Sequence, residues 1–363
     1  MGFMKKSLLF FITFVMIFSS VLTGCTSIQS SNQPKFKTVE DMAGRKVEVP
    51  EKIEKIYATD LSGTLLVYTF DEEKLCGINI NLTEDEKKYT SKYFQSLPVI
   101  GATAGKGKSA SPEEILSISP DIIVCMDSLD ESSISNMNKL QEQIKIPVVM
   151  LSSDITRTSE TYRCLGEILG DKKRADELAK YADQVFANID ALIKKVSSDK
   201  KVKVYYASGP AGLETGLKGS IKAQVIDISG GENVAEVPMG EEKGRTEVSI
   251  EQVLRWNPEL IIVAPSKSSG VKSCFNYIKD DEKWENIKAV KDGKVYETPY
   301  MPFNWFDKPT SINRLLGIKW LASIMYPQYV DYDIKVEAKE FYKKFYHIDL
   351  NNENIEEIMK NSI

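Results

Sequence analysis

Residues 171–197, DKKRADELAKYADQVFANIDALIKKVS, are the stretch on which the expected fold depends. Apolar side chains recur there at steps of three and one residues, as at Leu178, Ala182, Val185 and Ile189, which is the spacing of one face of an α-helix. Neither Gly nor Pro interrupts the stretch. Such a helix would be roughly 40 Å long, longer than most helices within one compact domain. We therefore expect a rigid connector between two domains; the alternative is an amphipathic helix on the surface of one domain.

The length and composition of the chain are consistent with two globular domains. With 363 residues, it exceeds the size at which a single hydrophobic core usually stops growing. Its five cysteines are far apart, no C-x-x-C motif is present, and His347 is the only histidine. This pattern argues against a zinc site or a disulfide scaffold, so we expect no bound metal and no cofactor.

The first 24 residues have the features of a lipoprotein signal peptide. Two lysines precede an apolar run at 8–18, which leads to Leu22-Thr23-Gly24-Cys25. This ending resembles the lipobox of bacterial lipoproteins, in which the chain is cut before the cysteine and the cysteine is acylated. We therefore expect Cys25 to be the lipid anchor, residues 25–35 to be an acylated polar tether, and the protein to lie on the extracytoplasmic face of the cell membrane. The alternative is an uncleaved membrane anchor.

Charge argues against one class of partner. Removal of residues 1–24 takes away Lys5 and Lys6 and no acidic residue, so the formal charge changes from −5 to −7. A net acidic chain is not typical of a general nucleic-acid-binding protein.

Strands and helices alternate along the rest of the chain, which is typical of parallel sheets covered by helices. The expected strands lie at 53–58, 75–80, 121–126, 146–151, 202–207, 260–264 and 294–298, and the expected helices at 63–70, 112–118, 134–144, 220–229, 250–256, 271–278 and 309–325. We expect an α/β fold with two Rossmann-like lobes, an N-terminal lobe at 36–158 and a C-terminal lobe at 201–363, joined by a bridging helix region at 159–200.

An internal repeat supports two equivalent lobes. The segment at 111–124, SPEEILSISPDIIV, aligns without gaps on SIEQVLRWNPELIIV at 249–263, which runs one residue further. Each copy reads as a short helix that ends before a Pro-preceded buried strand. Two such lobes on either side of a long helix predict a ligand site in the cleft between them, because α/β sheets bind ligands beyond the carboxyl ends of their strands.

Several segments resemble a known family. They are Thr38-Val39 with the run at 45–50, the segment ending at Asn257-Pro258-Glu259, the run AVKDGKVY at 289–296, and LGIKWLASIMYP at 316–327. Together they resemble the substrate-binding lipoproteins of bacterial ABC importers for iron-siderophores, haem and cobalamin, and the resemblance covers nearly all of residues 36–330. It implies two lobes bridged by one helix, a monomer, and delivery of a ligand to a membrane permease.

The resemblance also implies two permease-docking residues. In that family each lobe presents a glutamate to arginines of the permease, and the matching residues here are Glu113 and Glu251. Two carboxylates held at a fixed separation suit directional pairing with arginine. The alternative is that both only stabilise the amino termini of their helices.

Ligand-binding residues are expected in the loops that follow the strands. The candidates are Asp60, Ser62, Asn81, Lys106, Asp127, Ser208, Arg245, Phe303 and Trp305. Phe303 and Trp305 belong to a loop with four aromatic residues in seven, which either lines a pocket or packs into the lobe. Arg245 either pairs with an anionic group of the ligand or is a solvated surface charge.

The ligand expected from these residues is a metal chelate of the iron-siderophore type. Cobalamin, haem and molybdate or tungstate are alternatives within the same role, and the oxyanions would need little beyond Arg245, hydroxyl groups and backbone amides. Different classes are a sensor lipoprotein without transport and a metallocluster enzyme. Clustered cysteines are missing and the only histidine lies near the end of the chain, so we expect a binding protein rather than an enzyme.

Overall fold

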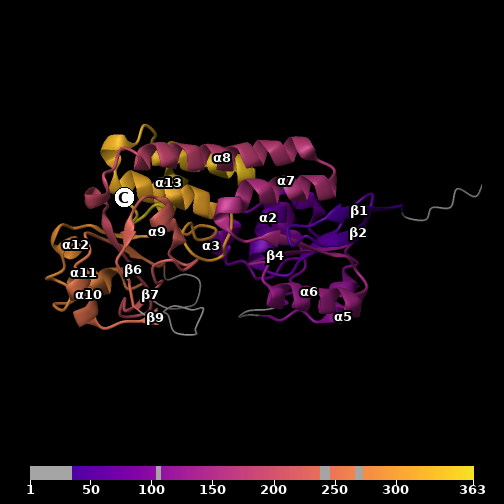
Figure 1. The fold of residues 1–363 in the computed structure, drawn as a ribbon, viewed down its shortest axis with the longest axis horizontal. Helices are drawn as coiled ribbons and strands as arrows, with labels where there is room; N and C mark the ends of the chain where they lie inside the picture. The colour runs from indigo at the N-terminus through magenta and orange to yellow at the C-terminus, as the bar shows by residue number, and fades with distance from the viewer. Residues whose placement is uncertain (1–34, 104–107, 238–245, 266–272) are drawn as a thin grey trace, which may run out of the picture. The chain divides into compact units, whose positions relative to one another are not determined.

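The computed structural model describes residues 35–103, 108–237, 246–265 and 273–363. Residues 36–363 form one compact unit. Within this unit lie two parallel sheets (Figure 1). We call the part with the first sheet the first lobe and the part with the second sheet the second lobe.

The first sheet has three parallel strands in the order β3-β4-β5. They are β3 (Ile56–Ala58), β4 (Ile122–Asp127) and β5 (Val148–Ser152), and an antiparallel hairpin of β1 (Phe36–Glu40) and β2 (Lys46–Pro50) precedes them. Except at the carboxyl end of β4, where Met126 is half-buried and Asp127 is exposed, the strands are buried on both faces, as expected for parallel strands covered by helices. The helices of this part are α2 (Leu61–Asp71), α3 (Glu84–Lys87), α4 (Lys92–Ser96), α5 (Pro112–Ser117), α6 (Glu131–Ile144) and α7 (Thr158–Leu169).

The second sheet has four parallel strands in the order β11-β10-β6-β8. They are β6 (Lys203–Ala207), β8 (Glu232–Asn233), β10 (Leu260–Val263) and β11 (Val295–Glu297), beside a small antiparallel pair of β7 (Glu214–Thr215) and β9 (Thr246–Glu247). The helices are α9 (Gln224–Ile228), α10 (Ile250–Trp256), α11 (Phe275–Asp280), α12 (Lys288–Lys291) and α13 (Asn313–Met325). The predicted α/β fold with two lobes is confirmed.

The long helix forms where the sequence predicts it. Helix α8 (Lys172–Ile193) begins after Asp171, whose side chain accepts a hydrogen bond from the Arg174 amide, and its buried stripe runs from Ala175 to Leu192. It contacts α7 and α2 of the first lobe and α13 of the second lobe, and Figure 1 shows it alongside these helices. Its 22 residues make a rod of about 33 Å.

The repeated segments have the same local structure. Ser111 and Ser249 cap α5 and α10, and each helix is followed by a strand, β4 or β10, at the centre of its parallel sheet. Serine is a preferred cap because its hydroxyl accepts a hydrogen bond from a free amide of the first turn. The repeat is therefore a repeat of structure as well as of sequence.

Several expected elements differ from the structure; the helix expected at 309–325, for example, begins only at Asn313. Residues 75–80 form isolated bridges rather than a strand, because Leu75 pairs with Ile56 and Ile78 pairs with Val99, so no continuous ladder forms. The helix expected at 220–229 begins only at Gln224, because turns occupy the residues before it.

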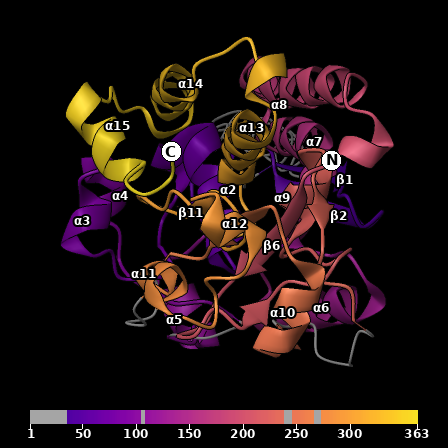
Figure 2. The same ribbon diagram turned by 90° about the vertical axis from the view of Figure 1, so that its left-hand side faces the viewer.

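One hydrophobic cluster includes residues of both lobes, among them Val124 of β4 and Ile262 of β10. The chain ends with α14 (Ile334–Phe341), a π-helix at Tyr342–Tyr346 and α15 (Asn352–Ile358), and of these the π-helix and α15 contact the first lobe. The Tyr89 hydroxyl donates to the Glu357 carboxylate over 2.8 Å, and Figure 2 shows α15 near α3 and α4. The lobes are thus connected by α8 and again by the C-terminal helices. Among the described residues, no helix is both long enough and apolar enough to cross a bilayer.

Candidate ligand-binding site

A small cavity of about 10 Å³ lies between the two lobes. First-lobe residues at or beyond the carboxyl ends of strands line one side, and residues just before and at the start of α13 line the other. Half of the lining residues carry a hydroxyl group on a short side chain: Ser62, Ser153, Thr158, Thr161, Thr310 and Ser311. The hydroxyls of Ser62 and Thr310 form a hydrogen bond of 3.1 Å across the lobe boundary. The cavity therefore lies where two α/β lobes are expected to bind a ligand.

Three long helices begin at this cavity. Ser62 is the second residue of α2, Thr158 is the first residue of α7, and Arg314 is the second residue of α13, and all three line the cavity. Helix amino termini carry partial positive charge and free amide groups. The convergence of three helix amino termini favours the binding of an anion in this cavity.

The Arg314 side chain supplies a full positive charge at the same place. Arg314 is 0% exposed. Its Nη2 donates to the Ile221 carbonyl oxygen over 3.1 Å and to Gln224 Oε1 over 2.9 Å. Its Nε and Nη1 are buried without a hydrogen-bond partner among the described residues, as is the Ser311 hydroxyl. Because buried polar groups are nearly always paired, three unpaired groups at one cavity indicate a missing partner.

The guanidinium keeps its charge at neutral pH. Burial lowers the pKa of Arg314 to about 10, while the nearby carboxylates of Asp307 and Asp154 act in the opposite direction. A group with this pKa is protonated at pH 7. Arg314 can therefore pair with an anionic ligand through the hydrogens on Nε and Nη1.

Asp60 lies beside the cavity, after the carboxyl end of β3. Its side chain caps α2 by accepting a hydrogen bond of 2.9 Å from the Gly63 amide. The pKa of Asp60 is raised to about 6, chiefly by burial and also by the charge of Asp127, while the hydrogen bonds from Gly63 and Ser62 act in the opposite direction. The ionised carboxylate is thus poorly stabilised in the folded protein.

The other predicted first-lobe residues are partly dispersed. Ser62 lines the cavity, whereas Asn81 is exposed on a loop outside the cavity lining. Asp127 is exposed at the end of β4, where it accepts hydrogen bonds from the Ser128 amide and the Ser133 hydroxyl. Lys106 lies outside the described residues.

The predicted residues of the second lobe are also separated. Ser208 is buried at the end of β6, where its hydroxyl donates to the Glu214 carbonyl oxygen over 2.9 Å. It lines a different depression of about 270 Å³, with Glu214 and Glu247. Arg245 lies outside the described residues.

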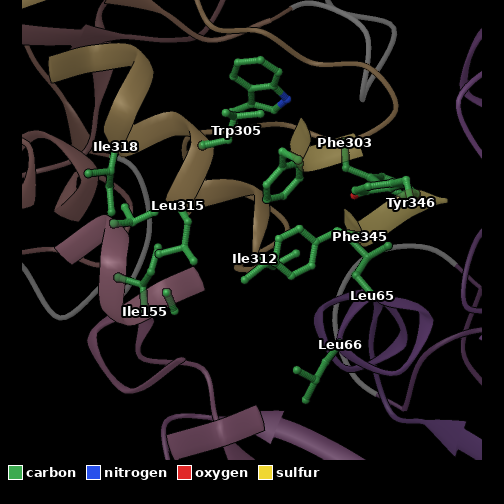
Figure 3. Close-up of a cluster of buried hydrophobic side chains, with 14 of the residues drawn as sticks. Leu65, Leu66, Ile155, Phe303, Trp305, Ile312, Leu315, Ile318, Phe345 and Tyr346 are labelled. Atoms are coloured by element: carbon green, nitrogen blue, oxygen red, sulfur yellow. The ribbon is translucent and has the colours of Figure 1, made fainter. Parts of the chain in front are cut away.

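The prediction that Phe303 and Trp305 line a pocket needs correction. Phe303 is 2% exposed and Trp305 is 0% exposed, and Figure 3 shows both within the hydrophobic core. Trp305 Nε1 donates to the Tyr342 hydroxyl over 3.2 Å. A Cβ atom at Gly317 of α13 would overlap the Trp305 carbonyl oxygen, so the loop lies directly against this helix. The aromatic loop is buried because packing against α13 removes its large apolar surface from water.

Arg314, by contrast, was absent from the predicted site residues. It lies inside the helix expected at 309–325, in the run SINRLLGIKW, where apolar residues predominate. Almost every residue of α13 is buried. An arginine in a helix that is apolar on nearly all sides is unusual, and this is the signal that could have identified it.

Metal ligands are not gathered at any place in the described part of the chain. No group of three His, Cys, Asp or Glu residues there is arranged to hold an ion. Cys76, Cys125 and Cys164 are free thiols.

The two glutamates expected to contact a permease occupy equivalent positions. Glu113 and Glu251 are each the second residue of a Ser-capped helix, α5 or α10, and both are exposed. Three residues further along each helix lies an exposed leucine, Leu116 or Leu254. Residues three apart are neighbours on a helix surface, so both lobes present the same acidic and apolar pair.

Comparison with known proteins agrees with this architecture. A profile of the family described as "Periplasmic binding protein" matches residues 56–301. The molybdate-binding protein MolA of Haemophilus influenzae is 28% identical over 347 residues, which cover 88% of this chain and 93% of MolA. The iron(3+)-hydroxamate-binding protein FhuD of Bacillus subtilis is 24% identical over 66% of this chain and 73% of its own length.

A solved structure is similar over nearly the same range. The ABC transporter solute binding protein from Sulfurospirillum deleyianum superposes with a TM-score of 0.79 at 31% identity, covering 89% of this chain and 99% of that protein. All three relatives are described as binding proteins rather than as enzymes. The chain therefore belongs to the periplasmic binding protein family and is an extracytoplasmic solute-binding protein of an ABC importer.

Proposed function

We propose that this protein binds a small tetrahedral oxyanion of the molybdate class between its lobes and delivers it to the permease. The observation that carries the proposal is the buried Arg314 guanidinium, whose Nε and Nη1 have no hydrogen-bond partner in the part of the chain that the structure describes. An oxyanion would accept hydrogen bonds from both nitrogens and would compensate the buried charge.

The surroundings of Arg314 suit the same chemistry. The Ser311 hydroxyl is also buried and has no hydrogen-bond partner among the residues that the structure describes, and the amino termini of α2, α7 and α13 meet at the cavity. Hydroxyls and helix amino termini stabilise a dianion without further cationic side chains. The similarity to a molybdate-binding protein over 88% of the chain supports this ligand class.

The sequence favoured an iron-siderophore chelate, with cobalamin, haem and molybdate or tungstate as alternatives. Two observations favour the smaller ligand. The cavity at the lobe boundary measures about 10 Å³, and Phe303 and Trp305, which would line a pocket for a bulky chelate, lie in the core. Slight parting of the lobes would admit an oxyanion, whereas a bulky chelate would require extensive separation of lobes that share one hydrophobic cluster.

For the remaining parts of the proposed role, the expectations from the sequence are kept. Glu113 and Glu251 dock the protein on the permease, and Cys25 carries the lipid anchor after removal of residues 1–24. Residues 25–35 act as the tether, and residues 36–158, 159–200 and 201–363 act as the first lobe, the bridging region and the second lobe. A sensor role without transport would leave the paired surface positions of Glu113 and Glu251 without a purpose.

Calorimetric titration of the mature protein tests the ligand class. Sodium molybdate, tungstate, sulfate and phosphate are titrated separately, and a ferric hydroxamate and a ferric catecholate serve as the competing class. We expect heat and saturation with molybdate or tungstate and none with the chelates. Saturable binding of a ferric chelate, with no binding of any oxyanion, would overturn the proposal.

A further inference from the structure

A glutamine connects the Arg314 guanidinium to a carboxylate of the other lobe. Gln224 Oε1 accepts a hydrogen bond of 2.9 Å from Arg314 Nη2, and Gln224 Nε2 donates one of 3.3 Å to Asp154 Oδ1. Gln224 begins α9 of the second lobe, whereas Asp154 follows β5 of the first lobe. The two charges therefore face each other across the lobe boundary with one neutral amide between them.

The orientation of this amide is determined by its partners. Its oxygen can only accept from the guanidinium and its NH₂ group can only donate to the carboxylate. Asp154 is itself held in place, because its Oδ1 also accepts from the Thr156 amide over 3.0 Å and from the Thr156 hydroxyl over 2.9 Å. Each group in this chain of contacts thus donates a hydrogen bond to the next, from Arg314 to Gln224 to Asp154. Each end of the chain is held in place by its own lobe.

This arrangement keeps the Asp154 carboxylate out of direct contact with Arg314, while the charge of Asp307 also acts on the guanidinium. Among the described residues, Nη2 donates only to uncharged oxygens, those of Ile221 and Gln224, while Nε and Nη1 have no partner. A carboxylate in direct contact would neutralise the guanidinium and compete with an anionic ligand. The neutral amide avoids this competition and still holds one edge of the guanidinium.

We propose that Gln224 is a positioning residue for the ligand: it aims the free edge of Arg314 at the cavity and keeps Asp154 from neutralising it. The same amide connects the two lobes on one side of the site. The orientation of the guanidinium and the contact between the lobes therefore depend on the same two hydrogen bonds. This inference rests on the proposed oxyanion-binding function.

Two substitutions of similar length test it by molybdate titration at pH 7.5. Gln224→Met removes both hydrogen bonds but adds no charge, and we expect affinity to fall about tenfold. Gln224→Glu adds a carboxylate against Nη2, and we expect a loss of at least about a hundredfold. A role in packing alone predicts equal effects, because both side chains resemble glutamine in length and volume.

Controls separate charge and folding from positioning. Gln141→Glu adds the same charge on α6, where the side chain accepts a hydrogen bond from the Val148 amide, and should leave molybdate affinity unchanged. If repulsion from Asp154 prevents Gln224→Glu from folding, the added Asp154→Asn change removes that repulsion. The double variant should then fold and still fail to bind.

The outcomes distinguish this inference from the function on which it rests. If the wild-type protein binds no oxyanion, the proposed function fails. If the wild type binds molybdate but Gln224→Glu binds as well as Gln224→Met, or as well as wild type, the positioning role is overturned and the proposed function stands.

Discussion

Replacement of Arg314 by methionine should leave the unliganded protein at least as stable while abolishing anion binding. Burial lowers the pKa of Arg314 from 12.5 to about 10, a difference that corresponds to about 3 kcal/mol against the charged form. This cost is present at every pH below about 10, because there the guanidinium is charged in both the folded and the unfolded chain. Methionine removes it and fills most of the same volume.

The substitution also removes the two hydrogen bonds that Nη2 donates to Ile221 and Gln224, and this offsets the gain. Their loss costs about 1 to 3 kcal/mol in total. The free energy of unfolding of Arg314→Met without ligand should therefore lie between that of the wild type and about 2 kcal/mol above it. A buried arginine with only a structural role would instead cost several kcal/mol when removed.

Ligand should reverse the order of stability. At a molybdate concentration one hundred times the Kd, binding stabilises the wild-type fold by about 2.7 kcal/mol, and Arg314→Met should gain nothing. Urea unfolding followed by circular dichroism, with and without sodium molybdate at constant ionic strength, measures both quantities. Arg163→Met is the matched control, because Arg163 is partly exposed and pairs with Asp183 on the surface. Two results would refute the reasoning: a large loss of stability in unliganded Arg314→Met, or undiminished stabilisation of that variant by molybdate.

Four further outcomes are expected. Asp60→Asn keeps the helix cap and removes a carboxylate whose pKa burial raises from 3.8 to about 6. By urea unfolding it should therefore be more stable than wild type by up to about 3 kcal/mol at pH 8 and equal to it below pH 4; lower stability at pH 8 would contradict this. Trp305→Phe should lower the free energy of unfolding by about 1 to 3 kcal/mol without changing the molybdate Kd, and a changed Kd would return Trp305 to the site. Gly317→Ala should destabilise by more than about 3 kcal/mol or fail to fold, since its Cβ would overlap the Trp305 carbonyl oxygen; a normal urea midpoint would show that the loop can move away. Glu113→Arg combined with Glu251→Arg should abolish cellular uptake of labelled molybdate at unchanged Kd, and normal uptake would count against docking through these residues.

The sequence alone determined the features that depend on near neighbours in the chain. The helix at 171–197 follows from apolar spacing and from the absence of Gly and Pro, and the structure places α8 within it. The equivalence of Glu113 and Glu251 follows from the repeat, since each lies two residues after a capping serine. Periodicity, caps and Pro positions act over a few residues, so they can be recognised without coordinates.

Only the tertiary structure decided what surrounds each candidate side chain. Arg314 meets Gln224 and the Ile221 carbonyl, about ninety positions earlier in the chain, while Trp305 is buried against α13 and Tyr342. An aromatic loop has the same local sequence whether it lines a pocket or fills a core. An arginine in an apolar helix likewise has the same neighbours in the sequence whether its charge is paired or free. The difference lies in burial and in contacts between residues far apart in the sequence, because these set the cost of an unpaired charge and the gain from apolar packing.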